Sequence, residues 1–139
     1  MRVLLDTDVV LDLVLAREPF AQASVQLFKL HEQGKIDAYI AAITPINVFY
    51  ITRKIKGGAT ARQAVDLLLG SLAVCPLSHG VLDEAYKLPF ADYEDAVQHA
   101  SATANGLDTI VTRDINDYKN ATILLSPTDF LANLKSQPT

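Results

Sequence analysis

The stretch LLDTDVVLD, residues 4–12, decides the fold, because an apolar run passes directly into acids and then into a second apolar segment. The first run predicts a buried strand, and a helix is expected to follow with Thr7 or Asp8 as its N-cap. Asp6 then lies at the carboxyl end of the strand, beside the crevice in which open parallel sheets bind ligands. For Asp8 and Asp12, an ordinary cap or solvated position and a functional role are both open.

The same pattern repeats along the chain. Short apolar runs that predict strands alternate with longer segments of helical spacing that carry capping signals. The strands are expected at residues 3–5, 38–41, 72–77, 109–112 and 122–125. The helices are expected at residues 20–33, 44–56, 61–69, 78–87 and 92–105, with a last short helix after residues 126–128. Thr44 and Ser78 are expected to be the N-caps of the helices that begin with them. This alternation predicts an α/β fold, a three-layer α/β/α domain around a parallel five-stranded sheet.

Length and composition set the class of protein. A chain of 139 residues, half of them hydrophobic, is long enough for one domain, which we expect at residues 1–134 with a polar tail at residues 135–139. Cys75 is the only cysteine, which excludes an intramolecular disulfide and a cysteine-based zinc site. The start of the chain has no apolar signal region, and the longest uncharged stretch, residues 67–82, is too short and too interrupted to span a bilayer. We expect a soluble, cytoplasmic protein without membrane contact.

Two further acids are expected at the same edge of the sheet as Asp6. Where the alanine-rich helix begins, Asp92 as N-cap and Glu94 in the first turn are explained by the helix itself. Asp95 is expected to project toward the sheet edge instead. Asp114 comes directly after the fourth expected strand, so it is a second strand-end acid in the same crevice.

Carboxylates that converge on one crevice repel each other unless a cation joins them, and hard oxygen ligands select Mg²⁺ or Mn²⁺. Such a site favours phosphoryl chemistry, in which one ion activates a water and a second stabilises the leaving oxygen. The formal charge of −4 argues against a protein that coats polyanions. It becomes +1 when five acids are left out, namely Asp6, Asp8, Asp95, Asp114 and Asp117. The acidity is therefore local to the predicted site.

Basic residues are candidates for substrate contact. The stretch from Arg53 to Arg62 holds four basic residues and no acid, which suits phosphate positioning. Cations that complement the dipole at a helix C-terminus explain the same stretch equally well. Arg17 and Arg113 each lie close to an acidic cluster in the sequence, and each is either a substrate contact or a salt-bridge partner.

Four segments in this order resemble the PIN-domain family of metal-dependent ribonucleases, which includes the toxins of bacterial VapC-type toxin–antitoxin pairs. They are LLDTDV (4–9), REPF (17–20), EDAVQ (94–98) and VTRDINDY (111–118), and the resemblance covers essentially the whole chain. It implies a parallel five-stranded sheet, acids gathered on Mg²⁺ or Mn²⁺, and hydrolysis of RNA. An antitoxin protein is one expected partner. The apolar face at residues 49–51 is either core or the surface of an expected homodimer.

The resemblance assigns roles residue by residue. Asp6, Asp95 and Asp114 match three of the family's acids, which bind the metal and carry the catalysis, and Asp117 matches an auxiliary metal ligand. Thr112 is the hydroxyl neighbour of these acids. The residues expected to contact substrate are Thr7, Asp8, Arg17, Arg53, Thr112 and Arg113.

One position departs from the family pattern. Many members carry a site glutamate on the helix after the second strand, and the matching segment TPINVFY, residues 44–50, offers Asn47. We expect Asn47 on the crevice-facing side of that helix, as the fourth residue of the catalytic site. Its amide oxygen can bind a metal or hold a water but adds no negative charge. A second function is therefore open, in which a catalytically weakened PIN domain binds RNA or a protein without cutting.

A third function class is a phosphatase of the haloacid-dehalogenase type, because DTDVV, residues 6–10, also fits the nucleophile motif of that family. Asp6 would then be a covalent nucleophile and Asp8 an acid/base. That chemistry also needs a lysine near the site and usually a cap domain. The chain has no well-placed strand-end lysine and little room for a cap, so this function ranks third.

Overall fold

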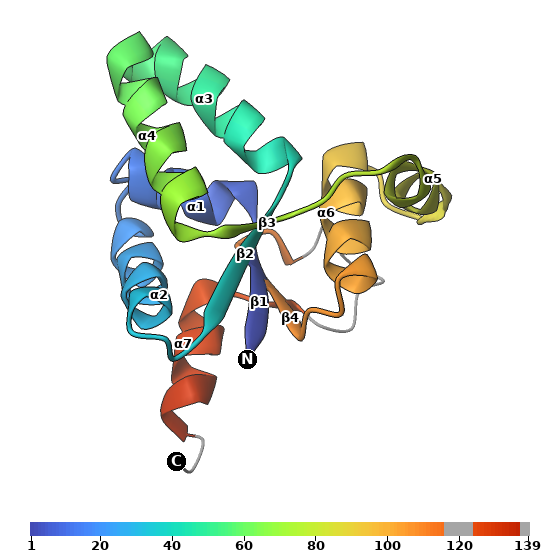
Figure 1. The fold of residues 1–139 in the computed structure, drawn as a ribbon. Coiled ribbons are helices and arrows are strands. Elements are labelled where there is room, and N and C mark those ends of the chain that lie inside the picture. Colours follow the sequence, from blue (N-terminus) through green and yellow to red (C-terminus); the bar gives the residue numbers. More distant parts are fainter. Residues whose placement is uncertain (116–123, 137–139) are drawn as a thin grey trace.

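Five parallel strands form one sheet in the computed structural model, which describes residues 1–115 and 124–136 (Figure 1). The strand order is β3-β2-β1-β4-β5, and every neighbouring pair is parallel. The strands are β1 (Arg2–Leu5), β2 (Asp37–Ala41), β3 (Ala73–Cys75), β4 (Thr109–Val111) and β5 (Leu124–Leu125). The predicted parallel five-stranded sheet is confirmed.

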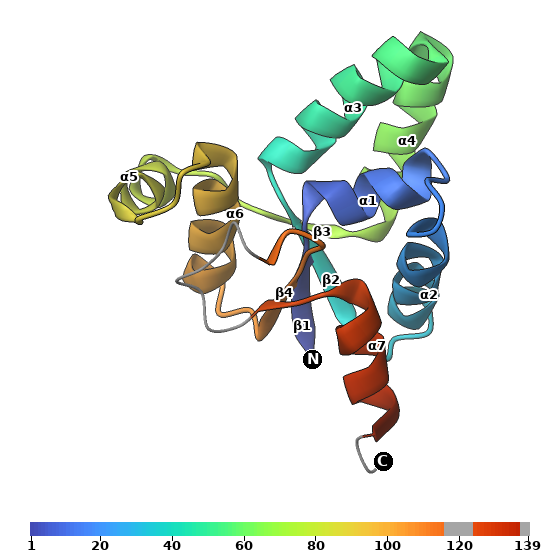
Figure 2. The ribbon, with the colours of Figure 1, turned by 180° about the vertical axis from the view of Figure 1, so that it is seen from behind.

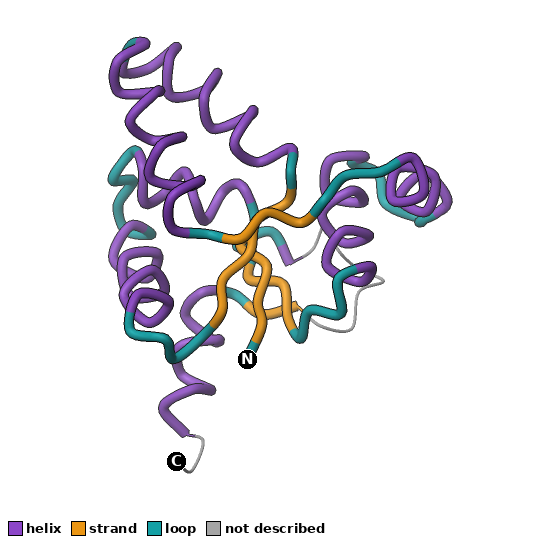
Figure 3. The backbone as a smooth tube through the Cα atoms, viewed as in Figure 1, coloured by secondary structure: helices purple, strands orange, loops and turns teal. Residues whose placement is uncertain are grey.

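Helices cover both faces of this sheet. Figures 1 and 2 show α1, α2 and α7 on one side of it and α5 and α6 on the other, while α3 and α4 form a hairpin at one end. The same three layers are visible in Figure 3, where the strands lie between the helices. The helices of the described residues are α1 (Thr7–Val14), α2 (Ala21–Glu32), α3 (Ile43–Lys56), α4 (Gly58–Ser71), α5 (His79–Lys87), α6 (Tyr93–Ala104) and α7 (Pro127–Ser136).

The central strand β1 is buried on both faces. Val3 and Leu5 belong to the larger apolar cluster with α1 and α2, whereas Leu4 packs on the opposite face with Ile110 of β4. Successive side chains of a strand point to opposite faces, and a strand covered on both of them is apolar throughout. Asp6, the next residue, therefore emerges at the carboxyl edge of the sheet from a rigidly packed strand.

The start of α1 differs from its prediction. Asp6 occupies the N-cap position, and the helix begins at Thr7. The prediction that Thr7 or Asp8 caps this helix is wrong, because β1 passes into α1 without a separate turn and both residues are already helical. The Asp6 side chain makes no capping hydrogen bond. It accepts a hydrogen bond from Thr112 instead.

The boundaries of three other elements also shift. Thr44 lies inside α3 and is not its N-cap, because the helix begins one residue earlier. α4 begins at Gly58, three residues before its predicted start, and it extends beyond its predicted end. The longer helix leaves β3 shorter than the predicted residues 72–77, and Pro76, which has no N–H to pair, follows the strand directly.

Two predicted N-caps are confirmed. The Ser78 hydroxyl accepts a hydrogen bond of 3.2 Å from the Val81 N–H at the start of α5. The Asp92 carboxylate accepts one of 3.0 Å from the Asp95 N–H at the start of α6. Both bonds satisfy first-turn N–H groups that have no partner within their own helix.

The C-terminal helix α7 extends to Ser136, so Lys135 and Ser136 are helical although the predicted tail included them. Residues 137–139 of that tail, residues 122–123 of the predicted fifth strand, and Asp117 lie outside the described residues. Among the helices described, none has the length and apolar character that a membrane span requires.

Candidate functional site

A pocket of about 360 Å³ lies at the carboxyl ends of β1 and β4. Acids and arginines make up most of its lining, which draws on four separate stretches of the chain. The lining residues are Asp6, Thr7, Asp8, Leu11, Arg17, Asp92, Glu94, Asp95, Arg113 and Asp114. The structure thus brings together three acids predicted to bind metal and four of the residues predicted to contact substrate.

Asp6 is held at the floor of this pocket by hydrogen bonds to both its backbone and its side chain. Its N–H donates to the carbonyl of Val111 at 3.0 Å, which continues the pairing of β1 with β4 by one residue. The buried Thr112 hydroxyl donates to Oδ2 of Asp6 at 2.5 Å and accepts from the N–H of Asp114 at 3.0 Å. One hydroxyl therefore links the two strand-end acids.

Thr7, which lines the pocket, connects α1 to two other helices by hydrogen bonds. Its N–H donates to Oε1 of Gln98 on α6 at 3.2 Å, and its hydroxyl pairs with that of Thr44 on α3 at 3.0 Å. Thr44 and Gln98 are both fully buried, and sequence reasoning assigned a site role to neither of them. Gln98 had a weak signal, because it lies three residues after Asp95 and so shares a helix face with it.

Burial changes the protonation of the two acids at the start of α1. It raises the pKa of the Asp6 carboxyl, against the effect of the Thr112 hydrogen bond, which lowers it. Burial and the nearby charge of Asp6 raise the pKa of Asp8 to about 7. Oδ1 of Asp8 is inaccessible to solvent and has no hydrogen-bond partner among the described residues. The raised pKa of Asp8 favours its protonated form below about pH 7, which avoids a second charge beside Asp6.

The donor atoms of this pocket fit a hard divalent cation. All of the candidate ligands are carboxylates, the group that Mg²⁺ and Mn²⁺ prefer over sulfur and imidazole. The part of the chain that the structure describes contains no group of three acidic, histidine or cysteine side chains placed to hold a metal ion. Mg²⁺ commonly binds through one or two carboxylates and keeps several waters, so a partly hydrated ion suits this arrangement.

Asp12, for which the sequence left a solvated position and a functional role open, is buried and holds two arginines of the pocket. The interpretation of Asp12 as a solvated acid is wrong, because it is fully buried and forms ion pairs with two arginines. Its Oδ1 accepts from Nε of Arg17 at 2.9 Å and from Nη2 of Arg113 at 3.2 Å, and its Oδ2 accepts from Nε of Arg113 at 2.7 Å. The salt-bridge alternative is therefore confirmed for Arg17 and Arg113, and both also line the pocket.

Other predicted site residues lie elsewhere. Asn47, half-buried on α3, is not among the residues that line the pocket. Arg53 is exposed near the C-terminal end of α3, where its guanidinium stacks on the rings of Tyr50 and Phe49 at 5.1 and 5.9 Å. Asp117 falls outside the described residues. Asn47 therefore matches a site position of the family in sequence, but it does not line the described pocket.

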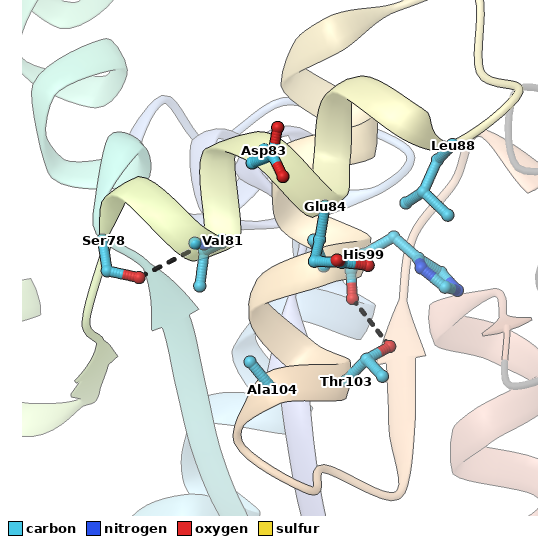
Figure 4. Close-up of a pocket in the computed structure, with 10 residues that line it drawn as sticks. Ser78, Val81, Asp83, Glu84, Leu88, His99, Thr103 and Ala104 are labelled. Atoms are coloured by element: carbon cyan, nitrogen blue, oxygen red, sulfur yellow. Dashed lines mark hydrogen bonds between the residues drawn. The ribbon is translucent and has the colours of Figure 1, made fainter.

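A second cavity, of about 450 Å³, lies between α5 and α6 (Figure 4). Its acids are Asp83 and Glu84 of α5, so it shares none of the strand-end acids. His99 lines it and contacts the ring of Phe90 edge to face at 5.4 Å. Burial lowers the pKa of His99, which favours the neutral ring. This histidine therefore belongs to the helix packing beside the cavity and not to the carboxylate pocket.

Comparison with known proteins identifies the family. The model of the PIN domain matches residues 2–116, and the chain therefore belongs to the PIN-domain family. A comparison with curated proteins gives no match.

Solved structures share the fold at low sequence identity. VapBC2 from Rickettsia felis, bound to a DNA fragment from its promoter, has a TM-score of 0.68 at 18% identity, over 91% of this chain and 98% of that one. VapC20 from Mycobacterium tuberculosis, described as a toxin that cleaves the sarcin-ricin loop, has a TM-score of 0.70 at 13% identity, over 87% and 95%. A toxin–antitoxin complex from Klebsiella pneumoniae has a TM-score of 0.66 at 20% identity, over 90% and 97%.

Proposed function

We propose that this PIN-domain protein is a metal-dependent endoribonuclease that acts as the toxin of a toxin–antitoxin pair. The observation that carries the proposal is that Asp6, Asp95 and Asp114 line one and the same pocket, at the carboxyl ends of β1 and β4. Family membership over residues 2–116 supports the nuclease class. Cleavage of the sarcin-ricin loop by the structurally similar VapC20 supports RNA as the substrate.

In this proposal Asp6, Asp95 and Asp114 hold Mg²⁺ or Mn²⁺, with Asp117 as an auxiliary ligand. When bound, the metal supplies an activated water and stabilises the charge on the leaving oxygen. The chain itself orients these acids, because the Thr112 hydroxyl bonds both Asp6 and the Asp114 backbone. Thr7, Asp8, Arg17, Arg53 and Arg113 are proposed to contact the RNA. The predicted contact at Thr112 is wrong, because this side chain is fully buried.

A PIN domain that binds without cutting is the second candidate. Two observations favour it: Asn47 stands where many relatives carry glutamate, and no three-ligand group is formed among the described residues. A phosphatase of the haloacid-dehalogenase type has less support, since no lysine is among the described residues that line the pocket.

We also propose two protein partners and a cytoplasmic location. An antitoxin is supported by the structural neighbours, one of which is a toxin–antitoxin complex by description. A homodimer is supported by apolar side chains left exposed on α3, where Ile46, Tyr50 and Ile55 are each more than half exposed.

The test is cleavage of a single-stranded RNA and of a small phosphate ester by the purified chain. The proposal predicts that the RNA is cut in Mn²⁺ or Mg²⁺, that EDTA abolishes cutting, and that the ester is left intact. Full RNA cleavage in EDTA would exclude the proposed chemistry. Hydrolysis of the ester alone would favour the phosphatase, and RNA binding without cleavage would favour the weakened PIN domain.

A further inference from the structure

The two arginines of the pocket are both held by the buried carboxylate of Asp12. Arg17 follows α1, and Arg113 follows β4, 101 residues after Asp12 in the chain. Arg113 offers Nε and Nη2 to Asp12 in a two-bond contact, and Arg17 offers Nε to Asp12 and Nη2 to the Asp8 carbonyl at 3.1 Å. These bonds fix both guanidinium groups beside the same pocket.

A further contact restrains Arg113. The centre of its guanidinium lies 3.9 Å from the centroid of the Phe20 ring, which is itself 42% exposed. Stacking on an aromatic face leaves the in-plane N–H groups of a guanidinium directed outward. The plane of Arg113 is therefore set from one side by a ring and from one edge by a carboxylate.

The charge of this group suits an anion. One carboxylate neutralises one of the two guanidiniums, so the cluster of Asp12, Arg17 and Arg113 carries a net charge of +1. Each guanidinium has five N–H groups, and the described contacts use two on each. The side chains of Arg17 and Arg113 remain 38% and 28% exposed. The pocket thus has an acidic side, suited to cations, and a basic side with accessible donors.

We propose that Arg17 and Arg113 form a phosphate subsite for the backbone of single-stranded RNA, and that Asp12 is the positioning residue that fixes them. This inference rests on the proposed function. Two neighbouring phosphodiesters of the RNA occupy the pocket. One lies at the acidic side, and the non-bridging oxygens of the next one bind at the basic side. Fixed N–H groups bind such oxygens at a smaller entropic cost than free arginines, because their rotamers are already restrained.

The experiment measures RNA binding apart from cleavage. The affinity of the full chain for a fluorescent ten-nucleotide single-stranded RNA is measured by anisotropy in Ca²⁺ across a range of salt concentrations. Each phosphate contact with a single strand contributes about 0.7 to the slope of log K against log salt. Arg17→Gln and Arg113→Gln are each expected to weaken binding several-fold and to reduce the slope by about 0.7. Lys29→Gln, an exposed change of equal charge on α2, is expected to leave the slope unchanged.

The role of Asp12 is tested by whether Asp12→Asn weakens or tightens RNA binding. Asp12→Asn removes a negative charge from the pocket, so general electrostatics predicts tighter RNA binding, whereas positioning predicts weaker binding. Its effect is also expected to vanish in a chain that already carries Arg17→Gln and Arg113→Gln, as for residues that act through one another. Arg113→Lys keeps the charge without the two-bond contact and is expected to weaken binding as well. If Asp12→Asn fails to fold, RNA binding by Arg113→Lys tests whether the positioning of the arginines matters.

The outcomes separate this inference from the proposed function. Arginine-dependent RNA binding without cleavage in Mn²⁺ would support the subsite and contradict the nuclease. Cleavage in Mn²⁺ with unchanged slopes for both arginine variants would support the nuclease and overturn the subsite. A glutamate decapeptide that binds more tightly than the RNA, with the same dependence on the arginines, would also overturn it, because the ligand would then be an acidic protein segment.

Discussion

The Thr112 hydroxyl donates a 2.5 Å hydrogen bond to Oδ2 of Asp6, and in this way β4 supports the acid at the end of β1. Both residues are buried, at 0% and 4% exposure, so water does not replace this bond when it is lost. A hydrogen bond to the charged form of a buried carboxyl stabilises that form. The charge that Asp6 offers to a metal therefore depends on Thr112.

Thr112→Val is expected to lower Mn²⁺ affinity about tenfold, since loss of a hydrogen bond that orients a metal ligand typically costs 10–100-fold. The variant keeps the shape of the side chain but leaves a buried acceptor without its donor, so we expect a loss of about 1–3 kcal/mol in the free energy of unfolding. Calorimetry with Mn²⁺ and urea unfolding measure the two effects. Thr109→Val, at a buried threonine of β4, is the matched control, and equal losses in both variants would contradict the assignment.

Asp8 is expected to make the metal-free protein less stable as the pH rises. Its pKa is raised to about 7 in the folded state, against about 3.9 for an unfolded aspartate, so the folded state binds the proton more tightly. The stability contributed by protonation is complete below about pH 4 and is lost as the pH rises through 7. Asp8→Asn should flatten this dependence and raise the free energy of unfolding at pH 8 by about 1–3 kcal/mol.

Urea unfolding in EDTA at pH 5 and pH 8 tests this expectation. Asp66→Asn, an exposed change of the same kind on α4, is the control. A variant Asp8→Asn with the same pH dependence as the unmodified chain would show that Asp8 ionises normally.

Asp12→Asn is expected to destabilise the fold by about 3 kcal/mol, at the lower end for a broken buried ion pair because its arginine partners are partly exposed. The loss should fall as salt increases, since freed arginines at the surface are screened. Chemical denaturation at two salt concentrations gives both numbers, with Asp66→Asn again as the control. A change within about 0.5 kcal/mol would mean that the Asp12 cluster adds little to stability.

Some of this site was predictable from sequence because its positions are set locally. Asp6 and Asp114 follow apolar runs, and the pairing of β1 with β4 then brings the ends of those runs together. The buried position of Asp12 was not predictable, because one of its two arginine partners, Arg113, is 101 residues away in the chain. The site contacts of Thr44 and Gln98 were not predicted for the same reason, because their partner Thr7 lies on α1, far from both in the chain.

The boundaries that shifted have a related cause. A strand and a helix that join without a turn leave no room for a separate cap, so local capping signals at Thr7 and Asp8 were misleading. Where a loop precedes the helix, as at Ser78 and Asp92, the same signals predicted the cap correctly.

Asn47→Glu is expected to tighten Mn²⁺ binding. Asn47 lies one turn after Thr44, which contacts Thr7 of the pocket, and glutamate is longer by one methylene. The added carboxylate would then reach a cation that is otherwise held by three acids and water. Calorimetry on the folded variant, with Asn47→Gln as the uncharged control of equal length, measures the effect. Equal affinities for the two variants would show that position 47 does not face the metal.

The most direct test of the carboxylate pocket as a divalent metal centre is calorimetric titration of Mn²⁺ into the unmodified chain and into Asp6→Asn, near neutral pH. Circular dichroism on both proteins shows that the fold is kept. Because Asp6 lies at the floor of the pocket and is proposed as a ligand, the account predicts at least a tenfold loss of Mn²⁺ affinity in Asp6→Asn. Unchanged Mn²⁺ affinity in a folded Asp6→Asn would contradict it.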